Sequence, residues 1–234
     1  MIRFACASGS GDLGMADSED NWPKWHHRKG PAKSLHALGV ISSNYNIFES
    51  ALFGLFEHHL EIRGVSAEFS KDVYWGMAEN QRSAGITKIF TLHEKDQATI
   101  DCVEKLLLYF GWCKDSRNKL VHATINPPIF GGKKDTLYLA KRSGQKAAKI
   151  NYTALNLQDL RDIADRIYDG SEYCNELKYF LMARDYTDAQ LEDVQGVLAY
   201  DALPKIPPVP KEIILSEVNH NPPIPPHLRK SSPE

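Results

Sequence analysis

Apolar residues recur at helical spacing along the first long segment of this chain. From Ser34 to about Arg63 the bulky positions are separated alternately by three and four residues, which predicts one long helix with a continuous buried face. These positions are Leu38, Ile41, Tyr45, Phe48, Leu52, Leu55, His59 and Ile62. Gly64 follows where a helix C-cap belongs. Such a face can close a bundle within one chain or join two chains, and the pattern does not distinguish these alternatives.

A second helix is predicted from about Ser70 to Gln81. Its inward positions are Val73, Met77 and Ala78. Glycine is a poor helix former, so we expect Gly85 to separate this helix from a short apolar segment that follows it. That segment contains Ile86, Ile89, Phe90 and Leu92.

Capping residues mark the later helices. Asp96 is a suitable N-cap for a third long helix that continues to Val121. Asn156, with Asp159 three residues on, predicts the start of a fourth long helix that extends to about Leu181. Thr187-x-x-Gln190 has the spacing of a capping box and predicts a shorter fifth helix through Leu198.

Two short segments between these helices alternate in the manner of β-strands. Thr136 to Lys141 and Lys149 to Thr153 flank Ser143-Gly144, which predicts a β-hairpin. From Leu203 to Glu234 the chain holds nine of its 13 prolines, so we expect an extended or disordered tail. The predicted organisation is an irregular extension over 1–33, a helical domain over 34–201 with its hairpin at about 133–154, and a proline-rich tail over 202–234.

Composition narrows the function classes. With 42% hydrophobic and 25% charged residues, the 234-residue chain can bury one sizeable core, and a net charge of −2 excludes a protein-wide basic field. Its cysteines are scattered and show no zinc-ligand spacing, so we expect no metal site and no cofactor; they are Cys6, Cys102, Cys113 and Cys174. No apolar run reaches the length of a membrane span, and we expect a cytoplasmic protein.

A motif with candidate chemistry ends the third long helix. It reads Arg117-Asn118-Lys119-Leu120-Val121-His122, and Pro127-Pro128 closes the segment. This pattern resembles the HEPN family (higher eukaryotes and prokaryotes nucleotide-binding), whose helical domains carry an Arg, a polar residue and a His late in a helix. The resemblance implies a bundle of four to five helices, and many members of that family are ribonucleases.

The spacing of the motif poses a geometric problem. In an ideal helix Asn118 lies beneath His122, whereas Arg117 is turned away from His122 by about 140°. Both side chains therefore reach one phosphate only if the last turn deforms or if a second chain completes the site. The HEPN resemblance implies the second solution, a homodimer in which Arg and His from both protomers line one cleft.

The residue types suit cleavage of RNA by attack of a ribose 2′-OH on the adjacent phosphate. Histidine titrates near neutrality and can carry the proton. Arginine stays charged and can hold two phosphate oxygens as negative charge accumulates. Asn118 can orient the imidazole or hold a phosphate oxygen. The expected function is thus a metal-independent endoribonuclease with Arg117, Asn118 and His122 as catalytic residues.

A basic run follows the motif and offers a second candidate contact with RNA. Six basic residues against one acid, Asp135, give a net charge of +5 between Lys133 and Lys149, and the candidate RNA-binding residues among them are Lys133, Lys134, Lys141 and Arg142. Exposed strand edges also carry lysines to prevent association between sheets, and the sequence leaves both explanations open.

Three alternatives remain for the function. In the first, Arg117 pairs with an acid such as Asp115 or one from another helix, and His122 caps the last carbonyls of its helix. In the second, the protein is a noncatalytic HEPN-like module for RNA binding or dimerisation. In the third, it is an interaction protein that docks a partner through its proline-rich tail.

Overall fold

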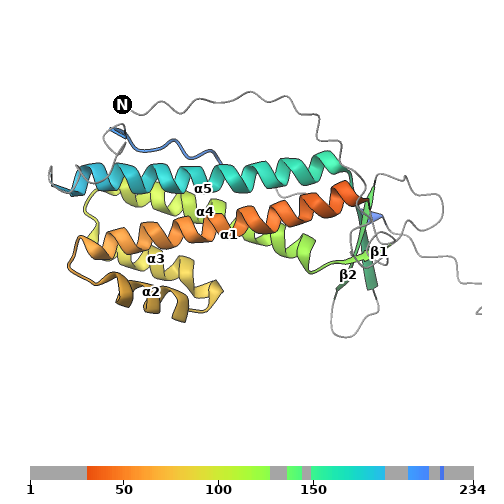
Figure 1. The fold of residues 1–234 in the computed structure, drawn as a ribbon, viewed down its shortest axis with the longest axis horizontal. Helices are drawn as coiled ribbons and strands as arrows, with labels where there is room; N and C mark the ends of the chain where they lie inside the picture. The colour runs from red at the N-terminus through yellow and green to blue at the C-terminus, as the bar shows by residue number, and fades with distance from the viewer. Residues whose placement is uncertain (1–30, 127–135, 144–148, 188–199, 211–216, 219–234) are drawn as a thin grey trace, which may run out of the picture.

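Helices dominate the part of the chain that the computed structural model describes, namely residues 31–126, 136–143, 149–187, 200–210 and 217–218. The helices are α1 (Ala32–Glu61), α2 (Ala67–Gly76), α3 (Glu79–His93), α4 (Gln97–Val121) and α5 (Leu157–Asp185). The strands are β1 (Thr124–Asn126), β2 (Leu137–Ser143), β3 (Lys149–Leu155) and β4 (Glu217–Val218). The helices form an elongated bundle with the small sheet at one end (Figure 1). The mostly helical fold class and the β-hairpin are therefore confirmed.

The core of the bundle lies between α1 and α5, which run side by side (Figure 1). Phe48 of α1 is fully buried, and its ring lies so close to Gly170 of α5 that a Cβ on Gly170 would be 2.4 Å from the Cε1 atom of Phe48. The ring of Phe110 on α4 meets Phe48 edge-on at 5.1 Å and stacks on Tyr45 at 5.4 Å. Glycine at position 170 thus permits the close approach of α1 and α5.

Local capping signals account for the helix ends that the sequence predicted. The carboxylate of Asp96 accepts hydrogen bonds from the backbone N–H groups of Ala98 and Thr99 at the start of α4. Asn156 and Asp159 form a reciprocal capping box at the start of α5. Gly64 has a positive φ of 79° just after α1, in the left-handed region that glycine favours.

The prediction for the second helix was wrong. The chain forms two helices there, and the break falls at Met77–Ala78, after the weak helix former Gly76. Gly85 does not break the chain but lies inside α3, where a Cβ would come within 2.8 Å of the Sδ atom of Met77. Gly85 thus makes room for Met77, which is partly buried, while Ala78 is exposed rather than inward.

The four strands form an antiparallel sheet in the order β1-β2-β3-β4. Strands β2 and β3 form the predicted hairpin, with Leu137 opposite Leu155 and Ser143 opposite Lys149. Strands β1 and β4 were not predicted, because segments of three and two residues are too short to show an alternating pattern. β1 begins directly after α4 and so attaches the sheet to the bundle.

Residues 200–210, which we call the strap, run along the helices without forming a helix or strand. Leu203 and Ile206 pack against the core, and the Sγ atom of Cys102 lies 3.7 Å from the carbonyl oxygen of Pro204. The first part of the predicted tail is therefore extended but packed on the bundle. Residues 1–30 and the helix predicted through Leu198 lie outside the described residues. No helix in the described ranges is long and apolar enough to cross a membrane.

Candidate functional site

The motif lies where α4 meets the sheet. Arg117 and Asn118 belong to the last turns of α4, and His122 is the residue that ends it, with φ −90° and ψ 2°. The backbone N–H of His122 donates to the carbonyl of Asn118 at 3.3 Å, and its side chain is exposed. The imidazole is therefore accessible to a ligand. The hydrogen bond to a carbonyl of the last turn is made by the backbone N–H of His122.

Arg117 is oriented toward α1. Its guanidinium carbon lies 5.4 Å from the centre of the Tyr45 ring, and its Nη1 donates to the Oδ1 of Asn118 at 2.8 Å. The side chain is half-buried, and its Nε atom is buried without a hydrogen-bond partner among the described residues. The amide oxygen of Asn118 is thus engaged by Arg117. Arg117 is thus half-buried against α1, whereas His122 is exposed.

A polar network extends from Tyr45 to α3. The hydroxyl of Tyr45 donates to the Oε1 of Glu79 at 2.9 Å, and the Nζ of Lys114 lies 3.6 Å from the same oxygen. Burial, followed by the hydrogen bond to Glu79, raises the pKa of Tyr45 well above its usual range. Burial alone would raise the pKa of Glu79, but the Tyr45 hydrogen bond and the charges of Lys114 and Arg117 lower it. Arg117 is therefore part of a partly buried electrostatic cluster.

The backbone of the predicted basic hairpin runs beside the end of α4. Thr124 of β1 pairs with Ala140 of β2, and Lys141 and Arg142 are the next two residues of β2. In an antiparallel pair, positions after Ala140 on β2 lie opposite positions before Thr124 on the other strand. The backbone at Lys141 and Arg142 is therefore on the side of this pair that faces His122. Lys133 and Lys134 lie outside the described residues.

The sequence did not single out Tyr45, Glu79 or Lys114 as neighbours of the motif. Lys114 carried a local signal, since residues three apart on a helix are neighbours and Lys114 precedes Arg117 by three positions. Tyr45 and Glu79 are 72 and 38 residues from Arg117 in sequence, and only the packing of α1 and α3 brings them close. Across the described residues, no group of three His, Cys, Asp or Glu side chains is placed to hold a metal ion.

Comparison of the chain with protein-family models, with curated proteins and with solved structures finds no match in any of the three.

Proposed function

We propose that this protein is a metal-independent endoribonuclease of HEPN type that acts as a homodimer. The observation that supports this function best is the position of His122. Its imidazole is exposed at the end of α4, and β2 carries Lys141 and Arg142 beside that end. RNA bound by these two residues would therefore pass close to the proposed proton carrier.

In the proposed reaction the ribose 2′-oxygen attacks the adjacent phosphorus and the bond to the 5′-oxygen of the next nucleotide breaks. The His122 imidazole accepts the 2′-hydroxyl proton and then, as imidazolium, donates a proton to the leaving 5′-oxygen. Arg117 stabilises the negative charge on the phosphate oxygens. The products are a 2′,3′-cyclic phosphate and a 5′-hydroxyl.

The orientation of Arg117 supports a site that is shared between two chains. Arg117 lies against Tyr45 and His122 is exposed, so one chain does not present both groups on one helix face. A two-fold dimer that joins the ends of two α4 helices brings the exposed part of each guanidinium toward the partner's imidazole. Asn118 holds Arg117 through the hydrogen bond described above, which gives it a positioning role.

A second candidate function is a noncatalytic module for RNA binding or dimerisation. It is favoured by the contacts of Arg117 with Tyr45 and Asn118, because these contacts give the arginine a structural reason to be present. Arg117 forms no ion pair among the described residues, so the pairing with Asp115 considered above is not part of this alternative.

The decisive experiment measures cleavage of single-stranded RNA by the full chain in the presence of EDTA. We expect cyclic-phosphate products, and His122→Ala should reduce the rate by about 100-fold or more. The matched control is His36→Ala, which removes an exposed histidine from α1 and should leave the rate unchanged. RNA binding without any cleavage would instead identify the noncatalytic module.

A mixing experiment tests whether the site is shared. Arg117→Ala and His122→Ala chains are each expected to be inactive. Mixed dimers retain one intact Arg117 opposite one intact His122, so mixing and re-equilibrating the two variants should recover part of the activity. No recovery, with mixed dimers demonstrated by tagged chains, would contradict the composite site.

A further inference from the structure

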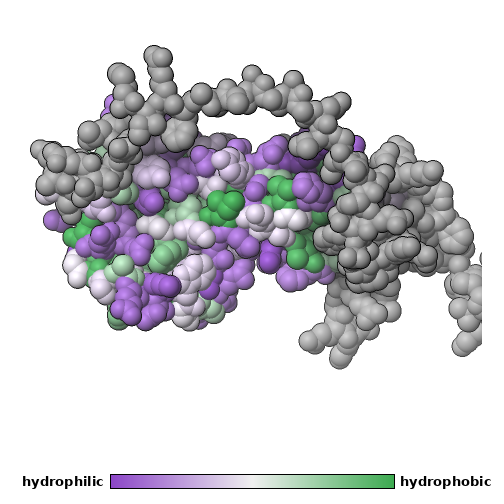
Figure 2. Space-filling view, in the orientation of Figure 1, coloured by the Kyte–Doolittle hydropathy of each residue, from purple (hydrophilic) through white to green (hydrophobic). Residues whose placement is uncertain are grey.

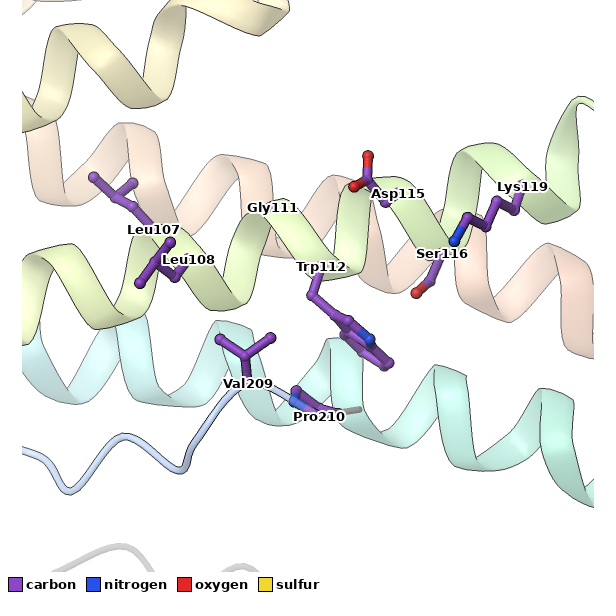
Figure 3. A pocket seen from close by; sticks show the side chains of 9 residues that line it. All are labelled: Leu107, Leu108, Gly111, Trp112, Asp115, Ser116, Lys119, Val209 and Pro210. Atoms are coloured by element: carbon purple, nitrogen blue, oxygen red, sulfur yellow. The ribbon is translucent and has the colours of Figure 1, made fainter. Parts of the chain in front are cut away.

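A groove of about 530 Å³ lies between α4 and the strap (Figure 3). Its lining includes Leu108, Gly111, Trp112 and Asp115 of α4 and Val209 and Pro210 of the strap. Trp112 and Arg117 are five residues apart, so the groove faces about 140° away from Arg117 around the helix. This volume lies within the range of roughly 300–1,000 Å³ that is common for ligand pockets.

Two features show that the groove can accept a further group. The indole of Trp112 is 9% exposed, and its Nε1 atom is buried without a hydrogen-bond partner among the described residues. A buried donor without an acceptor is unfavourable, so a ligand carbonyl that reaches Nε1 would be stabilised there. Gly111 is open as well, because a Cβ at that position would have no heavy atom within 4 Å.

The strap indicates which ligand suits this groove. Its residues 207–210 read Pro-Pro-Val-Pro, and the last two of them form one wall of the groove. The same pattern recurs as Pro-Pro-Ile-Pro at residues 222–225. Proline-rich segments favour the polyproline II conformation, which leaves the backbone carbonyls free and binds grooves that contain aromatic side chains at low entropic cost.

We propose that the groove binds the Pro222–Pro225 segment of a second copy of this chain. Six residues connect Pro210 in the groove to Glu217 of β4, which pairs with β3. Only three residues separate Val218 from Pro222. To bring Pro222 back to the groove of its own chain, these three residues would have to span a distance for which the chain uses six between Pro210 and Glu217. A second copy does not have this restriction.

Charge supports the same assignment. Arg229 and Lys230 follow the second proline motif, and Asp115 is an exposed carboxylate in the lining of the groove. An extended segment bound through its prolines can bring these cations near Asp115. The interaction does not involve His122 and is independent of ribonuclease activity.

A peptide of residues 219–230 tests the site directly. The receptor is the full chain with Pro222, Pro223 and Pro225 replaced by alanine, so that its own motif does not compete, and fluorescence anisotropy reports binding of the labelled peptide. We expect binding, with about tenfold weaker affinity for Trp112→Phe, which keeps an aromatic ring at this position but removes the N–H donor. A peptide with alanine at the same three positions should not bind.

A steric variant provides a matched comparison. Gly111→Leu fills the groove and replaces glycine with a better helix former, so the fold should be retained. Gly39→Leu makes the same change at an exposed position of α1 that also has no heavy atom within 4 Å of its Cβ. We expect Gly111→Leu to abolish peptide binding and Gly39→Leu to preserve it. Equal binding by both variants would overturn the groove as the binding site.

Analytical ultracentrifugation distinguishes a second copy from the same chain. The average mass of the wild-type protein should rise further with concentration than that of the triple proline variant, and Gly111→Leu should match the triple variant. Identical concentration dependence for all three proteins would overturn exchange between copies, even if the isolated peptide binds.

Discussion

The guanidinium of Arg117 lies over the ring of Tyr45, with 5.4 Å between the guanidinium carbon and the ring centre. This contact joins the end of α4 to the middle of α1, and the Tyr45 hydroxyl continues it to Glu79 of α3. Arg117 thus stabilises the packing of three helices. His122, five residues later, is exposed and makes no comparable contribution.

The two motif residues should therefore differ in their effect on stability. We expect Arg117→Ala to lower the free energy of unfolding by about 1 kcal/mol, because it removes a cation–π contact and leaves polar partners behind. His122→Ala should change it by less than about 0.5 kcal/mol. Urea unfolding followed by circular dichroism measures both values. Equal loss in the two variants would mean that the Tyr45 contact does not stabilise the fold.

Cleavage should depend on the ribose 2′-hydroxyl and not on a divalent ion. The proposed chemistry uses only the imidazole and guanidinium groups, so EDTA should leave the rate unchanged and DNA of the same sequence should stay intact. Both are checked on denaturing gels with matched oligonucleotides. Activity that is lost in EDTA and restored by magnesium would rule out this mechanism.

The basic hairpin should contribute to binding rather than to the chemical step. Neutralising Lys133, Lys134, Lys141 and Arg142 together should weaken RNA binding and flatten its dependence on salt, since fewer counterions are released. The rate on saturating RNA should be nearly unchanged. Titrations at several salt concentrations measure the slope. A steep fall in the saturated rate would place these residues in the catalytic step instead.

Stability should fall in weak acid because of His59. This side chain is fully buried and stacks on Phe90 at 3.8 Å between ring centres; burial first, and then the charge of Arg63, lower its pKa from 6.5 to about 4. In the unfolded chain His59 binds a proton below about pH 6.5, whereas in the folded chain it does so only near pH 4. As the pH falls between these values, protonation therefore favours the unfolded chain. We expect a loss of up to about 3 kcal/mol across this window.

Replacing His59 with leucine should make the free energy of unfolding nearly independent of pH over that window. His36→Leu, at an exposed position, is the control.

A second loss of stability is expected at lower pH, because of Asp185. Burial alone would raise the pKa of Asp185, but the His58 imidazole, 3.6 Å away, and the hydrogen bonds from Arg184 lower it from 3.8 to about 2. Its stabilising effect is complete above pH 3.8 and disappears as the pH falls to about 2. Urea titrations at successive pH values measure both effects.

The sequence predicted those parts of the fold that depend on neighbouring residues. Asp96 and the Asn156–Asp159 pair gave the correct starts of α4 and α5, because a capping side chain acts within three residues of itself. Gly85 misled the prediction, since its role is to make room for Met77, eight residues away in sequence. The low helix propensity of glycine takes no account of such a contact with a residue outside its own helix.

The candidate site was predicted only in part for the same reason. The motif and its position at the end of α4 follow from local periodicity. The contact of Arg117 with Tyr45 depends instead on how α1 crosses α4, and strand β4 comes from a segment more than 60 residues after β3. Such long-range relationships leave no periodic signal in either segment.

The attachment of the strap affects how the protein should be shortened for experiments. Residues 203 and 206 cover part of the core, and Glu217 and Val218 protect the outer edge of β3 by pairing with Tyr152 and Thr153. A truncation before Leu203 would expose apolar surface together with unpaired strand groups, a combination that promotes aggregation. If that truncated chain failed to bind a partner, the loss could reflect aggregation and not the missing proline motifs. A chain that ends after Val218 keeps both contacts and removes only residues 219–234, which contain the second proline motif.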